Sequence, residues 1–358
     1  MLRPHRLTAV FAAVLSGLAL SACAPSDPQS KTSAALTEGV LLPTYSAWVE
    51  ADRQLATSAK AFCAGSQDLT AARQAFFTAQ SAWAGLQPLL LGPLTEGNRA
   101  WQIQFWPDKK NLVARQVETL VKSKPQLTPA DLDKSSVVVQ GLTAYEYVLF
   151  DPALDLNDAT QKNRYCPLLT AIGDHQQRLS TSVLSQWQSQ DGIGAQLQSI
   201  PNARYAEGTE AIADLLRTQV TGIDSLKKKL GTPLGRQSKG LPQPYQAEGW
   251  RSNSSLNNIA ATLASAERVW QGAKQDGIRA LLSPEQADLG KRLDAAYADT
   301  RQRLAALQQP LSELLADEAG RNQLNALYDS LDKLHRLHSG ELAKTLSIQL
   351  GFNANDGD

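Results

Sequence analysis

The chain carries no surplus of either charge, because 35 lysine and arginine side chains are matched by 35 aspartate and glutamate side chains. Domains that bind nucleic acid through surface charge have a basic patch or stripe, so this balance argues against a nucleic-acid partner. Three enzyme signatures are also missing, namely Gly-x-Ser-x-Gly, the Walker phosphate loop and His-Glu-x-x-His. These absences argue against serine-hydrolase, P-loop and zincin chemistry.

Histidine is scarce, with four residues in the chain. His175 has polar neighbours and is predicted to lie at the surface. His335, His338 and Glu341 are spaced three residues apart, as ligands in metal sites can be. On a helix of 3.6 residues per turn, however, the three side chains spread over about 120° of the surface. A satisfied core histidine at position 338 is the alternative, and the surrounding leucine stripe favours it.

Long hydrophobic runs are missing beyond the first twenty residues. The one such run, 7–20, follows Arg3, His5 and Arg6. It is shorter than the roughly 20 apolar residues that a membrane-spanning helix needs. A basic start, a short apolar run and small residues at its end are typical of a secretory signal peptide.

The run ends at Leu20-Ser21-Ala22-Cys23, which resembles the lipobox of bacterial lipoproteins. We therefore predict a signal peptide at 1–22 and a lipid anchor on Cys23 that binds the protein to a membrane. An ordinary cleaved signal peptide with a chance cysteine is the alternative. Ala24 stands where an aspartate is linked to inner-membrane retention, so the predicted location is the cell envelope, at the outer membrane facing the periplasm.

Only two cysteines remain once Cys23 is assigned to lipid. Cys63 and Cys166 form an even pair in a compartment that is oxidising, so the sequence predicts a disulfide between them. Two free buried thiols are the alternative.

Strand signals are nearly absent, and apolar residues recur at helical spacing. Leu69, Phe76 and Trp83 belong to one such stripe. Long helices are predicted at 128–150, 163–190, 205–230 and 318–350. The fold class is all-α, with two helical bundles that are consistent with a diverged duplication, although no repeat proves one. The predicted order is a signal peptide at 1–22, a tether at 23–36, a bundle at 37–230, a linker at 231–249 and a second bundle at 250–358.

Glu146 stands inside the apolar segment 137–150, where a lone carboxylate is costly unless it is paired or protonated. Gly141 costs about 1 kcal/mol relative to alanine in a helix, which suggests close approach by another backbone or a ligand. Arg251, which follows the linker, is the first candidate partner for Glu146, and Arg99 is the second. A purely structural ion pair is the alternative to a binding site.

Large aromatic residues gather in segment 99–108, which includes Trp101, Phe105 and Trp106. They either wedge between helices as core or form the wall of a pocket.

Four segments together resemble the imelysin-like family, also called the M75 peptidase family. Gly141-Leu142-Thr143-Ala144-Tyr145-Glu146 is similar to its GxHxxE motif, and Phe105-Trp106-Pro107-Asp108 to its aromatic-Trp-Pro-Asp element. Arg164-Tyr165-Cys166-Pro167 and the C-terminal segment 350–358 are similar as well. The resemblance covers about 40 to 358. It implies a two-bundle envelope protein linked to iron acquisition, with iron or another divalent metal as the implied cofactor and iron-transport envelope proteins as implied partners.

The motif departs from the family at one position, because Thr143 replaces its histidine. A hydroxyl is a poorer ligand for zinc or iron than an imidazole, which argues against metallopeptidase activity. We therefore expect a non-catalytic protein that binds a ligand between two bundles. An M75-type metallopeptidase and a structural or docking protein are the alternatives. The candidate binding residues are Gly141, Thr143, Glu146, Arg251, Arg99 and Trp106.

Lipid attachment at Cys23 predicts a direct labelling result. Radiolabelled palmitate fed to expressing cells should enter the wild-type protein and should not enter Cys23→Ser. Equal labelling of both proteins would contradict the lipobox assignment.

Overall fold

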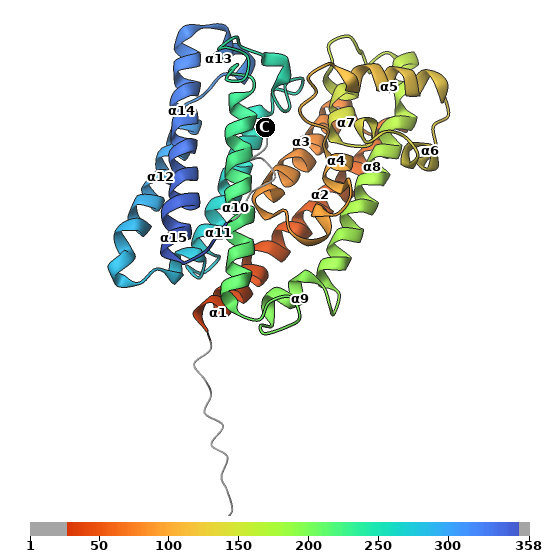
Figure 1. The fold of residues 1–358 in the computed structure, drawn as a ribbon. Helices are drawn as coiled ribbons and strands as arrows, with labels where there is room; N and C mark the ends of the chain where they lie inside the picture. The colour runs from red at the N-terminus through yellow and green to blue at the C-terminus, as the bar shows by residue number, and fades with distance from the viewer. Residues whose placement is uncertain (1–26, 351–358) are drawn as a thin grey trace, which may run out of the picture.

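The computed structural model describes residues 27–350, so the signal peptide, Cys23 and the C-terminal segment 351–358 lie outside the described residues. Within 27–350 every regular element is helical, which confirms the all-α prediction. The helices form two groups that lie side by side (Figure 1).

The first bundle is built on three long helices, α2 (Leu42–Cys63), α3 (Leu69–Leu86) and α8 (Ala159–Gln188). Helix α2 packs along both α3 and α8. The stripe predicted on α3 faces the core, where Phe76, Ala79 and Trp83 are buried. Asp68 caps α3, because its carboxylate accepts a hydrogen bond from the amide of Ala71 at 2.8 Å.

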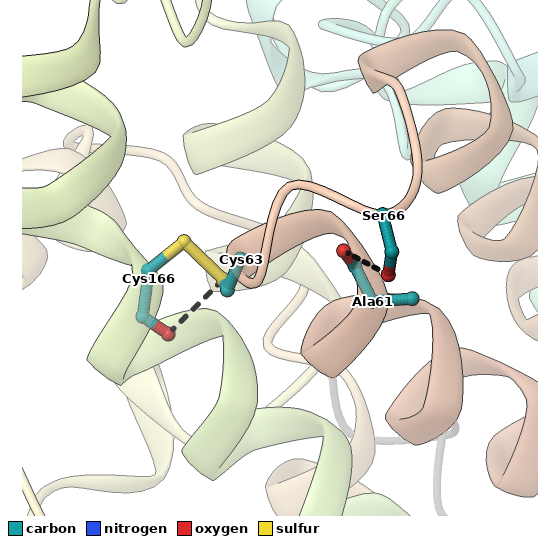
Figure 2. The surroundings of a disulfide bond; sticks show 4 residues. All are labelled: Ala61, Cys63, Ser66 and Cys166. Atoms are coloured by element: carbon teal, nitrogen blue, oxygen red, sulfur yellow. Dashed lines mark hydrogen bonds between the residues drawn. A yellow bond between two sulfur atoms is a disulfide. The ribbon is translucent and has the colours of Figure 1, made fainter.

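Cys63 and Cys166 form the predicted disulfide, with a Cα–Cα distance of 5.5 Å (Figure 2). Cys63 is the last residue of α2, and Cys166 lies in the first third of α8. The bond therefore ties together two helices of the first bundle through cysteines that are 103 residues apart in sequence.

The second bundle consists of α10 (Gly208–Gly231), α11 (Ser255–Gln271), α12 (Ala287–Ala305) and α14 (Glu318–Arg336). Helix α10 packs against α11 and α14 (Figure 1). The same helix also packs against α1 (Pro28–Leu36) and the 3-10 turn at Gln87–Leu89, so it contacts both groups of helices and lies where the predicted boundary at 230 falls. Helix α11 also packs against α3 and so joins the two bundles.

The predicted tether at 23–36 is wrong for its second half, because residues Pro28–Leu36 form helix α1. The carboxylate of Asp27 caps the helix, and Pro28 occupies its first position. The buried hydroxyl of Ser33 donates a hydrogen bond to the carbonyl of Leu197 at 2.7 Å. Small polar residues that look like a linker in the sequence are here the contact face of a packed helix.

The helix predicted at 128–150 is interrupted. It divides into α6 (Pro129–Asp133), a 3-10 turn (Val137–Val139) and α7 (Leu142–Phe150). The side-chain amide of Gln140 donates to the carbonyls of Leu132 and Ser135, which satisfies backbone groups where the helix stops. The last predicted helix also changes, since α14 ends at Arg336 and continues as a π-helical segment (Leu337–Leu342) and α15 (Ala343–Thr345).

Shorter elements connect these helices. They are a π-helical segment (Thr37–Leu41), α4 (Arg99–Ile103), α5 (Leu112–Ser123), α9 (Ile193–Gln198), α13 (Leu311–Ala316) and 3-10 turns at Gln87–Leu89, Gly92–Thr95, Pro244–Gln246, Ile278–Leu281 and Pro284–Gln286. Over residues 27–350, none of the helices combines the length and apolar character required to cross a membrane.

Helix α2 buries a carboxylate, Asp52, in the core of the first bundle. Its side chain is inaccessible to solvent, and neither oxygen makes a hydrogen bond to any described residue. Burial raises the pKa of Asp52 to about 8, and the nearby Ser180 hydroxyl of α8 offsets only part of that rise. The folded protein therefore holds Asp52 protonated at neutral pH.

The raised pKa of Asp52 predicts how stability depends on pH. The folded state binds this proton more tightly than the unfolded state, so the free energy of unfolding should fall as pH rises from about 4 to about 8. Asp52→Asn has no titrating group at this position, so its free energy of unfolding should decline less with pH. The difference should be about 1.4 kcal/mol for each unit by which the pKa of Asp52 is raised in the folded state. Urea denaturation of both proteins across this range measures the effect. A difference between them that is constant with pH would contradict the assignment.

Candidate functional site

Glu146 lies in α7 where the two bundles meet, and it is 3% exposed. Its Oε1 accepts two hydrogen bonds from Ser252, one from the backbone amide at 2.9 Å and one from the hydroxyl at 2.7 Å. Ser252 belongs to the segment that leads from the linker into α11. The Oε2 atom makes no hydrogen bond within the described part of the chain, so this oxygen is free to accept one from a ligand.

Several charges act on Glu146. Burial raises the pKa of its carboxyl group, and the two hydrogen bonds from Ser252 pull the pKa back down. The positive charge of Arg251 also lowers the pKa, whereas the negative charge of Glu248 raises it. Glu146 is thus one of two neighbouring buried carboxylates at the junction.

Arg251 is not the direct partner of Glu146, which corrects the predicted pairing. Its Nε donates to Oδ2 of Asp151 at 2.8 Å, and its terminal nitrogen donates to the side chain of Asn111 at 2.8 Å. The guanidinium also lies over the ring of Trp250 at 4.3 Å. The sequence identified the segment that meets Glu146, but the direct contact comes from Ser252, one residue further along, because the arginine side chain is held by Asp151.

Arg99 lies away from this contact. Its guanidinium donates to the carbonyl of Pro93 and the carboxylate of Glu96, both in the segment just before α4. The predicted role of Arg99 as second partner for Glu146 is therefore wrong. Trp106 does reach the junction, where its indole N–H donates to the carbonyl of Gln246 in the linker at 3.0 Å.

Gly141 and Thr143 contact the end of α4 and the loop that follows it. A Cβ at Gly141 would lie 2.2 Å from the carbonyl oxygen of Ile103 and 2.6 Å from that of Gln102. Glycine is therefore required here by close approach of another backbone, one of the two reasons inferred from the sequence. The hydroxyl of Thr143 donates to the carbonyl of Phe105 at 3.1 Å, so it holds this loop rather than facing a ligand with an open hydroxyl.

A buried ion pair at the junction was not predicted from the sequence. Lys229, at the end of α10, donates to Oε1 of Glu248 at 2.5 Å, and both side chains are at least nine-tenths buried. The other oxygen of Glu248 has no hydrogen-bond partner among the described residues. The run Lys227-Lys228-Lys229 at a helix end is typical of exposed side chains, so the sequence gives no sign that Lys229 is buried. The only signal for Glu248 is its position beside Trp250 and Arg251.

His335, His338 and Glu341 do not come together. Both ring nitrogens of His338 are engaged, with Nδ1 2.9 Å from the carbonyl of Leu334 and Nε2 3.1 Å from the hydroxyl of Tyr297. Because the carbonyl can only accept, Nδ1 carries the proton and Nε2 accepts from Tyr297. Burial lowers the pKa of His338 to about 4, so the ring is neutral. Glu341 instead pairs with Arg292 at the surface.

His175 is buried rather than exposed, and its Nδ1 lies 3.0 Å from Asp133. Burial lowers the pKa of His175, and the charge of Asp133 counters part of that effect.

The donor set does not fit the divalent metal that the family resemblance implies. Across residues 27–350, no group of three His, Cys, Asp or Glu side chains is placed to hold a metal ion. At the motif itself, Thr143 uses its hydroxyl on Phe105, and Glu146 supplies one available oxygen.

Fold and junction together define a two-bundle helical protein whose motif helix carries a buried carboxylate directed at the second bundle. The chain belongs to the imelysin family, because the family model for imelysin, Peptidase_M75, matches residues 41–338. The match confirms the resemblance that the motifs of the sequence suggested.

Three relatives are informative. Iron-regulated protein A of Synechococcus elongatus is 23% identical over 308 residues, which are 82% of this chain and 80% of that protein. The crystal structure of an imelysin-like protein from Psychrobacter arcticum has a TM-score of 0.78 and 22% identity, over 91% of this chain and 97% of that one. A structure described as an iron-regulated protein A precursor, from Parabacteroides distasonis, has a TM-score of 0.72 and 17% identity, with the same coverage. The structural likeness shows the shared fold.

The contact at Gly141 predicts a large loss of stability on a small change. Gly141→Ala would place a methyl group against two carbonyl oxygens, so the free energy of unfolding should fall by about 3 kcal/mol or more. Gly85→Ala is the matched control, because a Cβ there meets nothing within 4 Å inside helix α3. The control should gain up to about 1 kcal/mol from helix propensity. Similar thermal denaturation of the two variants would contradict the close approach.

Proposed function

We propose that this protein is a non-catalytic envelope lipoprotein that binds a ligand at the junction of its two bundles and takes part in iron uptake. The observation that carries the proposal is Glu146. Its carboxylate is buried at the junction, one oxygen is held by Ser252, and the other makes no hydrogen bond to a described residue. A single available acceptor in a buried setting is suited to orienting a ligand through hydrogen bonding.

The iron setting is supported by relatives. Two of the proteins that this chain is similar to carry the description iron-regulated protein A. The match to the imelysin family model covers most of the chain. A role close to the envelope is supported by the predicted signal peptide at 1–22 and by the segment that resembles a lipobox at Cys23.

The absence of catalysis is supported by the chemistry of the motif helix. Activation of water by a metal needs about three protein ligands and one open position. Thr143 offers a neutral hydroxyl already engaged with Phe105, and both ring nitrogens of His338 are engaged with Leu334 and Tyr297. Glu146 alone would hold a divalent ion weakly.

Growth under iron limitation tests the proposed function. A strain that lacks the gene should grow more slowly than its parent when an iron chelator is present, and equally when iron is added. Glu146→Gln keeps an oxygen that can accept from Ser252, but it replaces the available Oε2 acceptor with an NH₂ donor. The variant should therefore fold, and it should fail to restore growth of the deletion strain under iron limitation.

The wild-type gene should restore growth, and so should Glu341→Gln, the matched control, which alters an exposed carboxylate paired with Arg292. Equal growth of parent and deletion strain under iron limitation would contradict the role in iron uptake. Full rescue by Glu146→Gln would remove Glu146 from the function.

Thr143→His tests the argument against metal chemistry. Restoring the family's histidine adds an imidazole one helical turn from Glu146, so affinity for Zn²⁺ should rise by at least about tenfold over wild type. Isothermal titration measures the change, and Thr143→His combined with Glu146→Ala is the control that should lose it. Stoichiometric zinc in the wild-type protein, with chelator-sensitive cleavage of casein, would favour the metallopeptidase alternative.

A further inference from the structure

A small pocket lies beside Glu146's neighbour Glu248, at the same junction. Its volume is about 140 Å³, and it is lined by residues of both bundles and the linker. Three of the seven tryptophans of the chain, Trp83, Trp101 and Trp106, are among its walls. Pockets for whole drug-sized ligands are roughly 300–1,000 Å³, so this one admits a small head group.

The indole rings of this pocket are held in place. Trp83, on α3, donates its N–H to the side-chain oxygen of Gln104 at 2.8 Å. Trp106 donates its N–H to the carbonyl of Gln246 at 3.0 Å. With both N–H groups engaged, these two rings offer their faces and edges to the pocket rather than a hydrogen-bond donor.

Glu248 supplies a carboxylate to the same pocket. Its Oε1 pairs with Lys229, which also lines the pocket, whereas its Oε2 is buried and has no hydrogen-bond partner among residues 27–350. An unpaired buried carboxylate oxygen is costly, so a donor from outside the chain would stabilise it. A buried polar atom without a partner is thus the second, independent indication of a ligand here.

The charged side chains in the pocket lining balance each other, because Lys229 and Glu248 form an ion pair. Elsewhere at the junction Asp151 pairs with Arg251, whereas Glu146 is held by Ser252. Arg251 lies over the ring of Trp250, and no arginine or lysine of the described residues lies over Trp83, Trp101 or Trp106. The aromatic faces of the pocket therefore remain available to a bound positive charge.

We propose that this pocket, walled by Trp83, Trp101 and Trp106 and closed by Glu248, binds the ammonium head group of a small organic cation. Tryptophan faces attract the positive charge through the ring quadrupole, and Oε2 of Glu248 adds a carboxylate oxygen whose negative charge is shared with Lys229. The proposal rests on the proposed function in one respect, because it names the chemical class of the ligand at the junction. The head group belongs either to a free amine or to a membrane lipid.

Titration of the purified mature protein with choline and with ethanolamine tests the proposal. The protein carries 5-fluorotryptophan, and ¹⁹F NMR follows its seven indole signals. The signals of Trp101 and Trp106 should shift saturably, and that of Trp270, buried in the second bundle, should not. The neutral carbon isostere of choline, 3,3-dimethylbutan-1-ol, should bind at least about tenfold more weakly.

Three variants define the pocket. Trp101→Leu removes a wall whose side chain is 44% exposed, so the protein should fold and bind choline about tenfold more weakly. Glu248→Gln should also weaken binding. Glu248→Gln leaves Lys229 without its partner charge and can therefore unfold the protein. In that case the result with Trp101→Leu decides the outcome. Tyr245→Leu, an aromatic that is 70% exposed and lies outside this pocket, is the matched control and should bind as wild type.

The source of the head group is separated by a vesicle arm. If phosphatidylethanolamine vesicles shift the Trp101 signal and phosphatidylglycerol vesicles do not, the ligand is a lipid head group. If only the soluble amines shift the signal, the ligand is a free amine. Equal binding of choline and its neutral isostere, or unchanged binding by Trp101→Leu, would overturn the proposal. Neither result would alter the growth test with Glu146→Gln, so failure here is distinguishable from failure of the iron-related function.

Discussion

A buried carboxylate needs hydrogen-bond donors within reach, and Glu146 finds them on the segment that enters the second bundle. The amide and hydroxyl of Ser252 both bind its Oε1. Removing such a group from water is unfavourable unless these contacts form, so Ser252 offsets part of the cost of burying Glu146. The contact makes the junction between the bundles a specific interface as well as an apolar one.

The loop after α4 depends on the same helix from the other side. Gly141 allows the carbonyls of Gln102 and Ile103 to come within a distance that any side chain would block, and Thr143 holds the carbonyl of Phe105. These contacts position Trp106, which in turn binds the linker at Gln246. The motif helix, the aromatic loop and the linker therefore form one connected unit around Glu146 and Glu248. In this chain the threonine at the motif's histidine position has a structural partner, which explains how the fold retains the motif helix without an imidazole.

Local sequence signals predicted well those features that depend on neighbouring residues. The helical stripe on α3 and the disulfide were both predicted correctly, because periodicity and an even cysteine pair behind a predicted secretory signal can be read from the sequence. Local signals failed where packing overrides composition. Residues 28–36 have the composition of a linker, yet they form a helix because Asp27 caps it and its buried face packs against α10. The segment 128–150 has a helical pattern throughout, yet it is broken where Gly141 meets another backbone.

The sequence by itself determined that this protein is helical, that Glu146 and Gly141 are anomalous within an apolar segment, and that the segment around Arg251 is a plausible place for a partner. It could not determine that Ser252 rather than Arg251 touches Glu146, because the choice depends on Asp151 and Asn111 holding the guanidinium from another direction. Nor could it reveal the buried pair of Lys229 and Glu248, since a lysine at a helix end is exposed or buried according to what packs over it. Tertiary structure decided these points because hydrogen bonds and burial depend on distances between segments that lie far apart in the chain, as Arg251 and Asn111 do.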